Sequence, residues 1–200
     1  TLHIAAATSS AQKGETLEDS IRTVEQYCDG IVLRHPANNS SEIGAQILKV
    51  PLINAGAGAE SHPTQAILDL YTIREEIGTL GGKCITLIGD LKYGRTVHSL
   101  VELLSLRSNI RLKYVSPAFL RMPDTIKQFL ADRGVEQSEH SSIDEVIEVT
   151  DVLYVTRIQK ERLSIEELEI YERDGIESSY QITPRTLAGA KPNMCVMHPL

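Results

Sequence analysis

Apolar residues follow two alternating patterns along the chain, and these patterns predict an alternation of strands and helices. Short runs of β-branched and other apolar residues predict strands, whereas apolar residues three and four positions apart predict helices. The expected strands are 30–33, 51–54, 84–88, 112–115, a short strand at 135, 152–155 and 194–197. The expected helices are 15–27, 41–49, 63–77, 97–104, 126–130, 143–149, 164–171 and 183–190. Such alternation is typical of α/β folds with parallel sheets.

Local signals refine this pattern at several element ends. Thr16 and Asp19 form a candidate capping pair at the start of the first helix, and Pro63 suits the first turn of the long helix 63–77. The run 84–88 is apolar throughout, which indicates a strand buried on both faces of a parallel sheet. Glycines between 78 and 82 end the long helix and mark the best domain boundary, so we expect domains at 1–77 and 78–200 linked by that helix.

Composition places the chain among ordinary globular proteins. Its 200 residues are 42% hydrophobic and 24% charged, which excludes disorder and fibrous repeats. No apolar run approaches the roughly 18 residues of a membrane span. The net charge of −7 argues against a nucleic-acid partner but still allows a small anionic ligand in a locally positive pocket. Three scattered cysteines, Cys28, Cys84 and Cys195, indicate core packing in a reducing compartment, the cytoplasm.

Candidate chemistry gathers where the expected strands end, the edge at which parallel sheets bind ligands. Arg34, Arg95 and Arg157 each follow such a strand, and convergent guanidinium groups would bind carboxylate or phosphate. His62 lies at a helix N-terminus, where the helix dipole favours its neutral form, and Gln65 follows in the first turn. The alternatives are a salt-bridged or solvated role for each arginine taken alone and a capping role for His62.

Other kinds of site find less support. Gly56-Ala57-Gly58 lacks the third glycine of a dinucleotide fingerprint, no cluster has metal-ligand spacing, and no serine stands in a nucleophile elbow. We therefore expect no metal and no cofactor. We expect any reaction to proceed by positioning of the substrate and by electrostatic stabilisation. Lys13 by itself is most simply a solvated loop lysine. The glutamates between 161 and 177 are interpreted as a solvated helix face.

Six segments, in order and at matching spacing, resemble the catalytic chains of the aspartate carbamoyltransferases. The segments are Lys13-Gly14-Glu15-Thr16, Arg34-His35-Pro36, His62-Pro63-Thr64-Gln65, the run 89–99 (Gly-Asp-Leu-Lys-Tyr-Gly-Arg-Thr-Val-His-Ser), the run 156–162 (Thr-Arg-Ile-Gln-Lys-Glu-Arg) and His198-Pro199-Leu200. The related ornithine enzymes carry a His-Cys-Leu-Pro loop in place of the last segment, so the resemblance favours the aspartate enzymes.

The resemblance implies a carbamoyl-phosphate domain followed by an aspartate domain, and transfer of a carbamoyl group to L-aspartate in pyrimidine biosynthesis. It places Arg34 and His62 at the carbamoyl carbonyl and phosphate, and Gln65 at the carbamoyl amide. It assigns the two aspartate carboxylates to Arg95 with Thr96 and to Arg157 with Gln159. The main-chain carbonyl of Leu200 would contact the reacting amine, whereas Ser9 and Lys13 would enter a neighbouring subunit's site.

The shared loop implies a homotrimer with shared active sites. The family's Ser-Thr-Arg-Thr phosphate loop is absent, so we expect it before Thr1, and the family continues beyond Leu200. Each expected domain would then lack a part, and the chain as given would be an incomplete catalytic unit. Two alternatives stay open: a non-catalytic scaffold domain of a multifunctional pyrimidine-pathway protein, and ornithine-type transfer. A regulatory chain or fused pathway domains are further possible partners.

Overall fold

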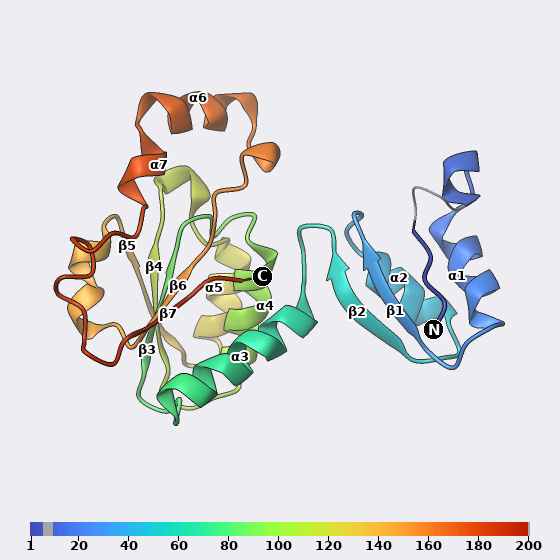
Figure 1. Cartoon of the computed structure of the whole chain (residues 1–200), viewed down its shortest axis with the longest axis horizontal. Coiled ribbons are helices and arrows are strands. Elements are labelled where there is room, and N and C mark those ends of the chain that lie inside the picture. The colour runs from blue at the N-terminus through green and yellow to red at the C-terminus, as the bar shows by residue number, and fades with distance from the viewer. Residues whose placement is uncertain (6–9, 200) are drawn as a thin grey trace. The chain divides into compact units, whose positions relative to one another are not determined.

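The computed structural model describes residues 1–5 and 10–199, and the chain divides into two compact units, Thr1–Thr64 and Gln65–Leu200. Each unit contains a parallel sheet with helices packed on it (Figure 1). The expected α/β class with parallel sheets is therefore confirmed. Across the described residues, no helix is both long enough and apolar enough to cross a membrane.

The first unit is built on two parallel strands, β1 (Ile31–His35) and β2 (Leu52–Ala57). The 3-10 helix η2 (Ser10–Lys13) and helices α1 (Leu17–Glu25) and α2 (Ser40–Ile47) complete it. The expected cap of α1 is present, because the Thr16 hydroxyl oxygen accepts from the Asp19 amide at 3.1 Å. Gly44 lets α2 lie close to β2, since a Cβ there would come within 2.8 Å of the Leu52 side chain.

The second unit is a five-stranded parallel sheet in the order β5-β4-β3-β6-β7. Its strands are β3 (Cys84–Ile88), β4 (Arg111–Val115), β5 (Glu136–His140), β6 (Val152–Val155) and β7 (Cys195–Met197). Its α-helices are α3 (Pro63–Ile77, which begins in the first unit), α4 (Arg95–Leu104), α5 (Asp124–Ala131), α6 (Ile165–Arg173) and α7 (Ile176–Ser179). The 3-10 helices are η3 (Ala118–Leu120), η4 (Ile143–Glu145), η5 (Ile147–Val149) and η6 (Lys160–Arg162).

Two apolar clusters sandwich this sheet. Ile85 and Leu87 of β3 pack with residues of α3, α4 and α5, whereas Ile88 packs with η4 and η5 on the other face. All five residues of β3 are buried, as its unbroken apolar run predicts. The central strand is therefore held rigidly, and the loop that leaves its carboxyl end has a fixed starting point.

The structure differs from the sequence predictions at several elements. Val135 precedes β5 rather than forming a strand, and 143–149 forms two 3-10 turns instead of one helix. The segment 183–190 forms turns, because the amide of Thr183 bonds the Thr186 hydroxyl and the amide of Thr186 bonds the Thr183 hydroxyl. Helix α7 was not expected, since its four residues carry no recognisable period.

Candidate functional site

In the first unit, Arg34 lies on β1, which runs on through His35 instead of ending at Leu33 as expected. The Arg34 side chain is exposed, and its alternation with the half-buried Leu33 and His35 follows the strand period of two. An exposed guanidinium near the carboxyl end of a parallel strand is available to an anionic ligand.

His62 directly precedes α3, and its Nδ1 lies 3.2 Å from the Thr64 hydroxyl. The preceding loop is tied to the end of β1, because the amide of Gly58 donates to the carbonyl of His35 at 3.0 Å. Gly58 has φ +47°, and a Cβ there would clash with Asn38 at 1.9 Å, so this contact requires glycine. The loop that leads to His62 is thus fixed to the loop that follows Arg34.

Four further residues were expected at the carbamoyl-phosphate site. Lys13 is the last residue of η2, and its side chain is exposed. Ser9 and Leu200 lie outside the described residues. Gln65 belongs to the second unit, where its side chain is only 6% exposed.

In the second unit, buried Asp90 joins the loops that follow β3 and β6. Its Oδ1 accepts from the Tyr93 amide at 2.8 Å, and its Oδ2 accepts from the Gln159 amide at 3.3 Å. The Gln159 side chain donates in turn to the Tyr93 carbonyl at 3.0 Å. Burial raises the pKa of Asp90 above its ordinary value, against the opposing effect of these hydrogen bonds. The loops that carry Arg95 and Arg157 are therefore linked.

The same two loops approach each other at Gly89. Its φ is +116°, and a Cβ there would lie 2.1 Å from the Thr156 carbonyl oxygen. The neighbouring strands β3 and β6 bring these residues together, and the Thr156 amide donates to the Ile88 carbonyl at 2.9 Å. Only glycine permits this contact, which brings the starts of the two loops together.

Arg157 already holds a carboxylate of its own loop. Its Nη1 lies 3.1 Å from Glu161 Oε2, and its Nη2 contacts Glu161 Oε1. This hydrogen-bonded pair lowers the pKa of Glu161 to about 2. The Arg157 guanidinium is exposed. An incoming carboxylate could therefore replace Glu161 on it, or bind to it beside Glu161.

A latch, defined here as Lys92, Tyr93 and Glu167, ties α6 to the loop after β3. Lys92 Nζ lies 2.7 Å from Glu167 Oε1, and the Tyr93 hydroxyl donates to Oε2 at 3.1 Å. Glu167 also completes the capping box of α6 with Ser164. Burial alone would raise the pKa of Glu167, but the bonds from Lys92, Ser164 and Tyr93 hold it below its ordinary value. The expectation of a fully solvated glutamate face is wrong at this residue, which is buried.

A buried chain of hydrogen bonds connects the start of α3 to the start of α4. Gln65 Nε2 donates to Asp69 Oδ1 at 2.9 Å, and the Tyr154 hydroxyl donates to Asp69 Oδ2 at 2.6 Å. The Tyr154 hydroxyl is also hydrogen-bonded to the side chain of Thr96. Burial raises the pKa of Tyr154, and its bond to Asp69 raises it further. Two residues expected at the site, Gln65 and Thr96, thus share one network.

Sequence reasoning did not identify Asp69, Asp90, Tyr154, Glu161 or Glu167. The i, i+4 spacing of Gln65 and Asp69 on an expected helix is a signal that could have revealed their contact. Asp90 and Tyr154 act through partners 69 and 85 residues away in the sequence, and no local pattern reports such pairs.

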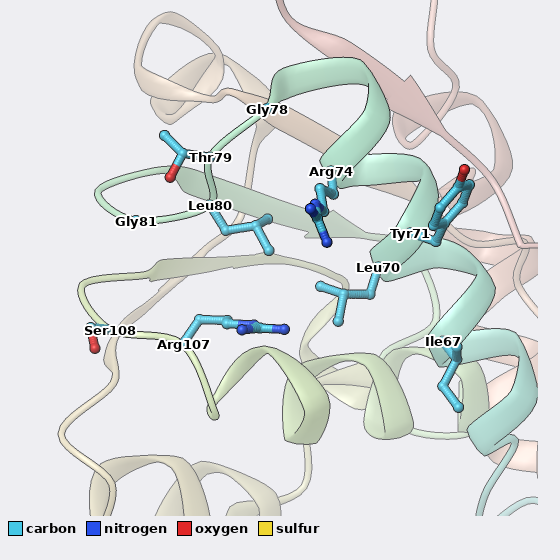
Figure 2. Close-up of a pocket in the computed structure, with 10 residues that line it drawn as sticks. All are labelled: Ile67, Leu70, Tyr71, Arg74, Gly78, Thr79, Leu80, Gly81, Arg107 and Ser108. Carbon is cyan, nitrogen blue, oxygen red and sulfur yellow. The ribbon is translucent and has the colours of Figure 1, made fainter.

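A cavity elsewhere in the second unit contains none of the expected site residues. It lies between α3 and the segments that lead into β3 and β4, with Ile67, Leu70 and Arg74 on one side and Leu80 and Arg107 on another (Figure 2). These segments meet at the amino ends of the strands, opposite to the edge where parallel sheets bind ligands. Within the described part of the chain, no group of three acidic, histidine or cysteine residues could hold a metal ion.

The linked loops carry groups whose chemistry suits an anionic ligand. Arg95 and Thr96 begin α4, whose N-terminal dipole favours negative charge, and Arg157 offers an exposed planar guanidinium on the linked loop after β6. Such a site suits a ligand with more than one carboxylate. Such groups would provide orientation and charge neutralisation rather than a covalent nucleophile.

Several known proteins are similar to this chain. The chain is 52% identical over 96% of its length to the "Multifunctional protein pyr1-3" of Dictyostelium discoideum, of which it covers 8%. It is 49% identical over 98% of its length to the "Aspartate carbamoyltransferase catalytic subunit" of Thermococcus gammatolerans, of which it covers 62%. An aspartate transcarbamoylase from Trypanosoma cruzi, solved with carbamoyl phosphate, matches the whole chain with a TM-score of 0.91 and 41% identity.

The chain spans 63% of that solved protein, so it corresponds to about two thirds or less of the catalytic chains it matches. Residues 1–75 match the sequence model of the carbamoyl-P binding domain of aspartate/ornithine carbamoyltransferases. Residues 81–200 match that of the Asp/Orn binding domain. Because the second match alone covers more than half of the sequence, the chain belongs to the aspartate/ornithine carbamoyltransferase family.

Proposed function

We propose that the protein containing this chain transfers the carbamoyl group of carbamoyl phosphate to L-aspartate, giving N-carbamoyl-L-aspartate and phosphate. The observation that carries this proposal is the linkage of the two loops that bear Arg95, Thr96, Arg157 and Gln159 in a family of carbamoyl transferases. Two separated carboxylate-binding groups would select a dicarboxylic amino acid, because a monocarboxylic one would leave one of the two guanidinium groups without its carboxylate partner.

The proposed chemistry needs no covalent enzyme intermediate. The aspartate amine attacks the carbamoyl carbon, the bond from that carbon to the phosphate oxygen breaks, and the departing phosphate takes up the proton of the amine. Arg34 and His62 would donate to the carbonyl oxygen as negative charge develops on it. Gln65 would contact the carbamoyl amide, and Ser9, Lys13 and Leu200 would complete the site as the family resemblance implies.

The proposal divides the chain at about residue 77 into a carbamoyl-phosphate part and an aspartate part. The domain matches, which end at 75 and begin again at 81, support this functional division. We further propose that the protein is a homotrimer in which Lys13 acts in a neighbouring subunit's site. We propose that it acts in the cytoplasm. Fusion to other pyrimidine-pathway domains is supported by the "Multifunctional protein CAD" of Squalus acanthias, of which the chain covers 9% at 51% identity.

An acceptor assay on the intact protein tests the proposal. Purified protein is mixed with carbamoyl phosphate and either L-aspartate or L-ornithine, and both phosphate and the carbamoylated amino acid are measured. We expect product with aspartate only. Product with ornithine alone would overturn the aspartate assignment. No product, together with no calorimetric binding of a phosphonate joined to a dicarboxylate, would favour the scaffold alternative.

A further inference from the structure

The carboxylate of Asp69 is buried between two side chains that both donate to it. It is 3% exposed, and its two oxygens receive the amide of Gln65 and the hydroxyl of Tyr154 at 2.9 and 2.6 Å. Asp69 is one helical turn from Gln65 on α3, so its own backbone holds it in register with that side chain. None of the chemistry described above uses this carboxylate.

The chemistry of these groups fixes the orientation of the Gln65 amide. An ionised carboxylate can only accept hydrogen bonds, whereas a glutamine amide has one end that donates and one that accepts. The nitrogen of Gln65 must therefore face Asp69, and its carbonyl oxygen must point away. A reversed amide would put two oxygens against each other in a buried place, which is costly.

We propose that Asp69 is a positioning residue that sets the direction of the Gln65 amide, so that Gln65 presents a hydrogen-bond acceptor to the donor substrate. This inference rests on the proposed function, in which Gln65 contacts the carbamoyl group. An acceptor there pairs with the NH₂ of a carbamoyl group and is left without a partner by the methyl of an acetyl group. Asp69 thus contributes to the choice between carbamoyl phosphate and acetyl phosphate.

The same carboxylate acts on Thr96 through Tyr154. A phenol has one hydrogen, and that of Tyr154 goes to Asp69, so the phenolic oxygen accepts from the Thr96 hydroxyl. This directs the hydroxyl hydrogen of Thr96 inward. Tyr154→Phe removes the hydrogen bonds from Tyr154 to Asp69 and Thr96 and leaves Asp69 facing Gln65. The effects of Asp69 on Gln65 and on Thr96 can therefore be separated by experiment.

The test measures binding of carbamoyl phosphate and of acetyl phosphate to the intact protein by calorimetry, without an amino-acid acceptor. In Asp69→Asn, the new amide can either accept from or donate to Gln65, so the direction of Gln65 is no longer set. We expect the preference for carbamoyl phosphate over acetyl phosphate to fall about five- to tenfold, the effect of one lost hydrogen bond. Tyr154→Phe leaves the pair of Gln65 and Asp69 in place and is expected to keep the preference.

Asp151→Asn is the matched control, because Asp151 is another partly buried aspartate, and its bonds go to the Cys84 amide and to Lys191 rather than to Gln65. It is expected to keep the preference. An unchanged preference in folded Asp69→Asn, or no preference in the wild type, overturns the inference. Absence of turnover in a wild type that still binds carbamoyl phosphate selectively would overturn the proposed function instead.

A measurement on the wild type covers the case in which Asp69→Asn does not fold. The side-chain amide protons of Gln65, identified by their loss in Gln65→Met, are compared by NMR with those of the exposed Gln46. We expect the Gln65 protons to exchange with solvent far more slowly, because one of them is held on Asp69. Equal exchange at Gln65 and Gln46 overturns the fixed orientation.

Discussion

Arg157 shows at the scale of one residue how a side chain can be prepared for a carboxylate. Its guanidinium faces both oxygens of Glu161 while remaining exposed. Under the proposed function, Arg157→Ala removes a charged pair of hydrogen bonds to the substrate. We expect the KM for aspartate to rise about thirtyfold or more, with binding of carbamoyl phosphate retained. Steady-state kinetics in each substrate measure both effects.

The control for this prediction is Arg173→Ala, because Arg173 is an exposed arginine that also bonds a carboxylate, that of its neighbour Asp174. It is expected to leave both KM values unchanged. If Arg157→Ala leaves the KM for aspartate at the wild-type value, the assignment of Arg157 is wrong.

Glu167 makes the stability of the latch depend on pH. Its pKa in the folded protein is below its ordinary value of 4.5, so the folded state favours the charged form. This contribution is complete above pH 4.5 and is lost as the pH falls through the lower, folded pKa. We expect Glu167→Gln to destabilise the protein at pH 7 and to reduce the loss of stability on acidification.

Urea unfolding of the wild type and the variant at pH 7 and below pH 4.5 measures this dependence. The exposed neighbour serves as the control, since Glu166→Gln changes the same charge on the same helix turn without touching Lys92 or Tyr93. Equal pH dependence in Glu166→Gln and Glu167→Gln would contradict the role of the latch.

At the scale of elements, sequence patterns predicted those parts of the fold whose burial is decided locally. The central strand β3 is apolar at every position, and α1 begins at its expected cap. The segment 183–190 was wrongly predicted as a helix, because Thr183 and Thr186 satisfy the backbone through their side chains. The bonds from Asp69 to Tyr154 and from Asp90 to Gln159 join residues that only the assembled sheet brings together, so no local pattern could reveal them.

The approach of the loops after β3 and β6 depends on Gly89. Gly89→Ala would place a Cβ 2.1 Å from a backbone oxygen that cannot move freely. We expect a loss of about 3 kcal/mol or more in the free energy of unfolding, from steric overlap added to an unfavourable φ. Denaturant unfolding measures this loss.

Gly82→Ala separates the steric cost of the added Cβ from the cost of a positive φ. Gly82 has φ +80° but no atom within 4 Å of the added Cβ, so we expect only the conformational cost of about 1 kcal/mol. If the two variants lose the same free energy, the close approach at Gly89 does not limit the structure.

At the scale of the whole molecule, the resemblance to the aspartate carbamoyltransferases predicted more about function than hydrophobic periodicity and composition did. Periodicity and composition indicated an α/β fold and an anion site, but neither indicates which anion. The ordered motifs from Lys13 to His198 predicted the family, which the domain matches confirm. The residues proposed for one reaction are divided between the first unit, which contains Lys13, Arg34 and His62, and the second. Under the proposed function, residues of both units would therefore contribute to one reaction.

A mixing experiment tests that assembly. If Lys13 acts in the site of a neighbouring subunit, Lys13→Ala and Arg157→Ala damage the same site from different chains. Each variant alone is expected to be nearly inactive at limiting aspartate. After the two are denatured together and refolded, random assembly of a closed ring gives about a quarter of the sites both native residues, with that share of wild-type activity. Activity that stays at the level of the separate variants, in refolded protein of trimeric mass, would place Lys13 and Arg157 of one chain in the same site.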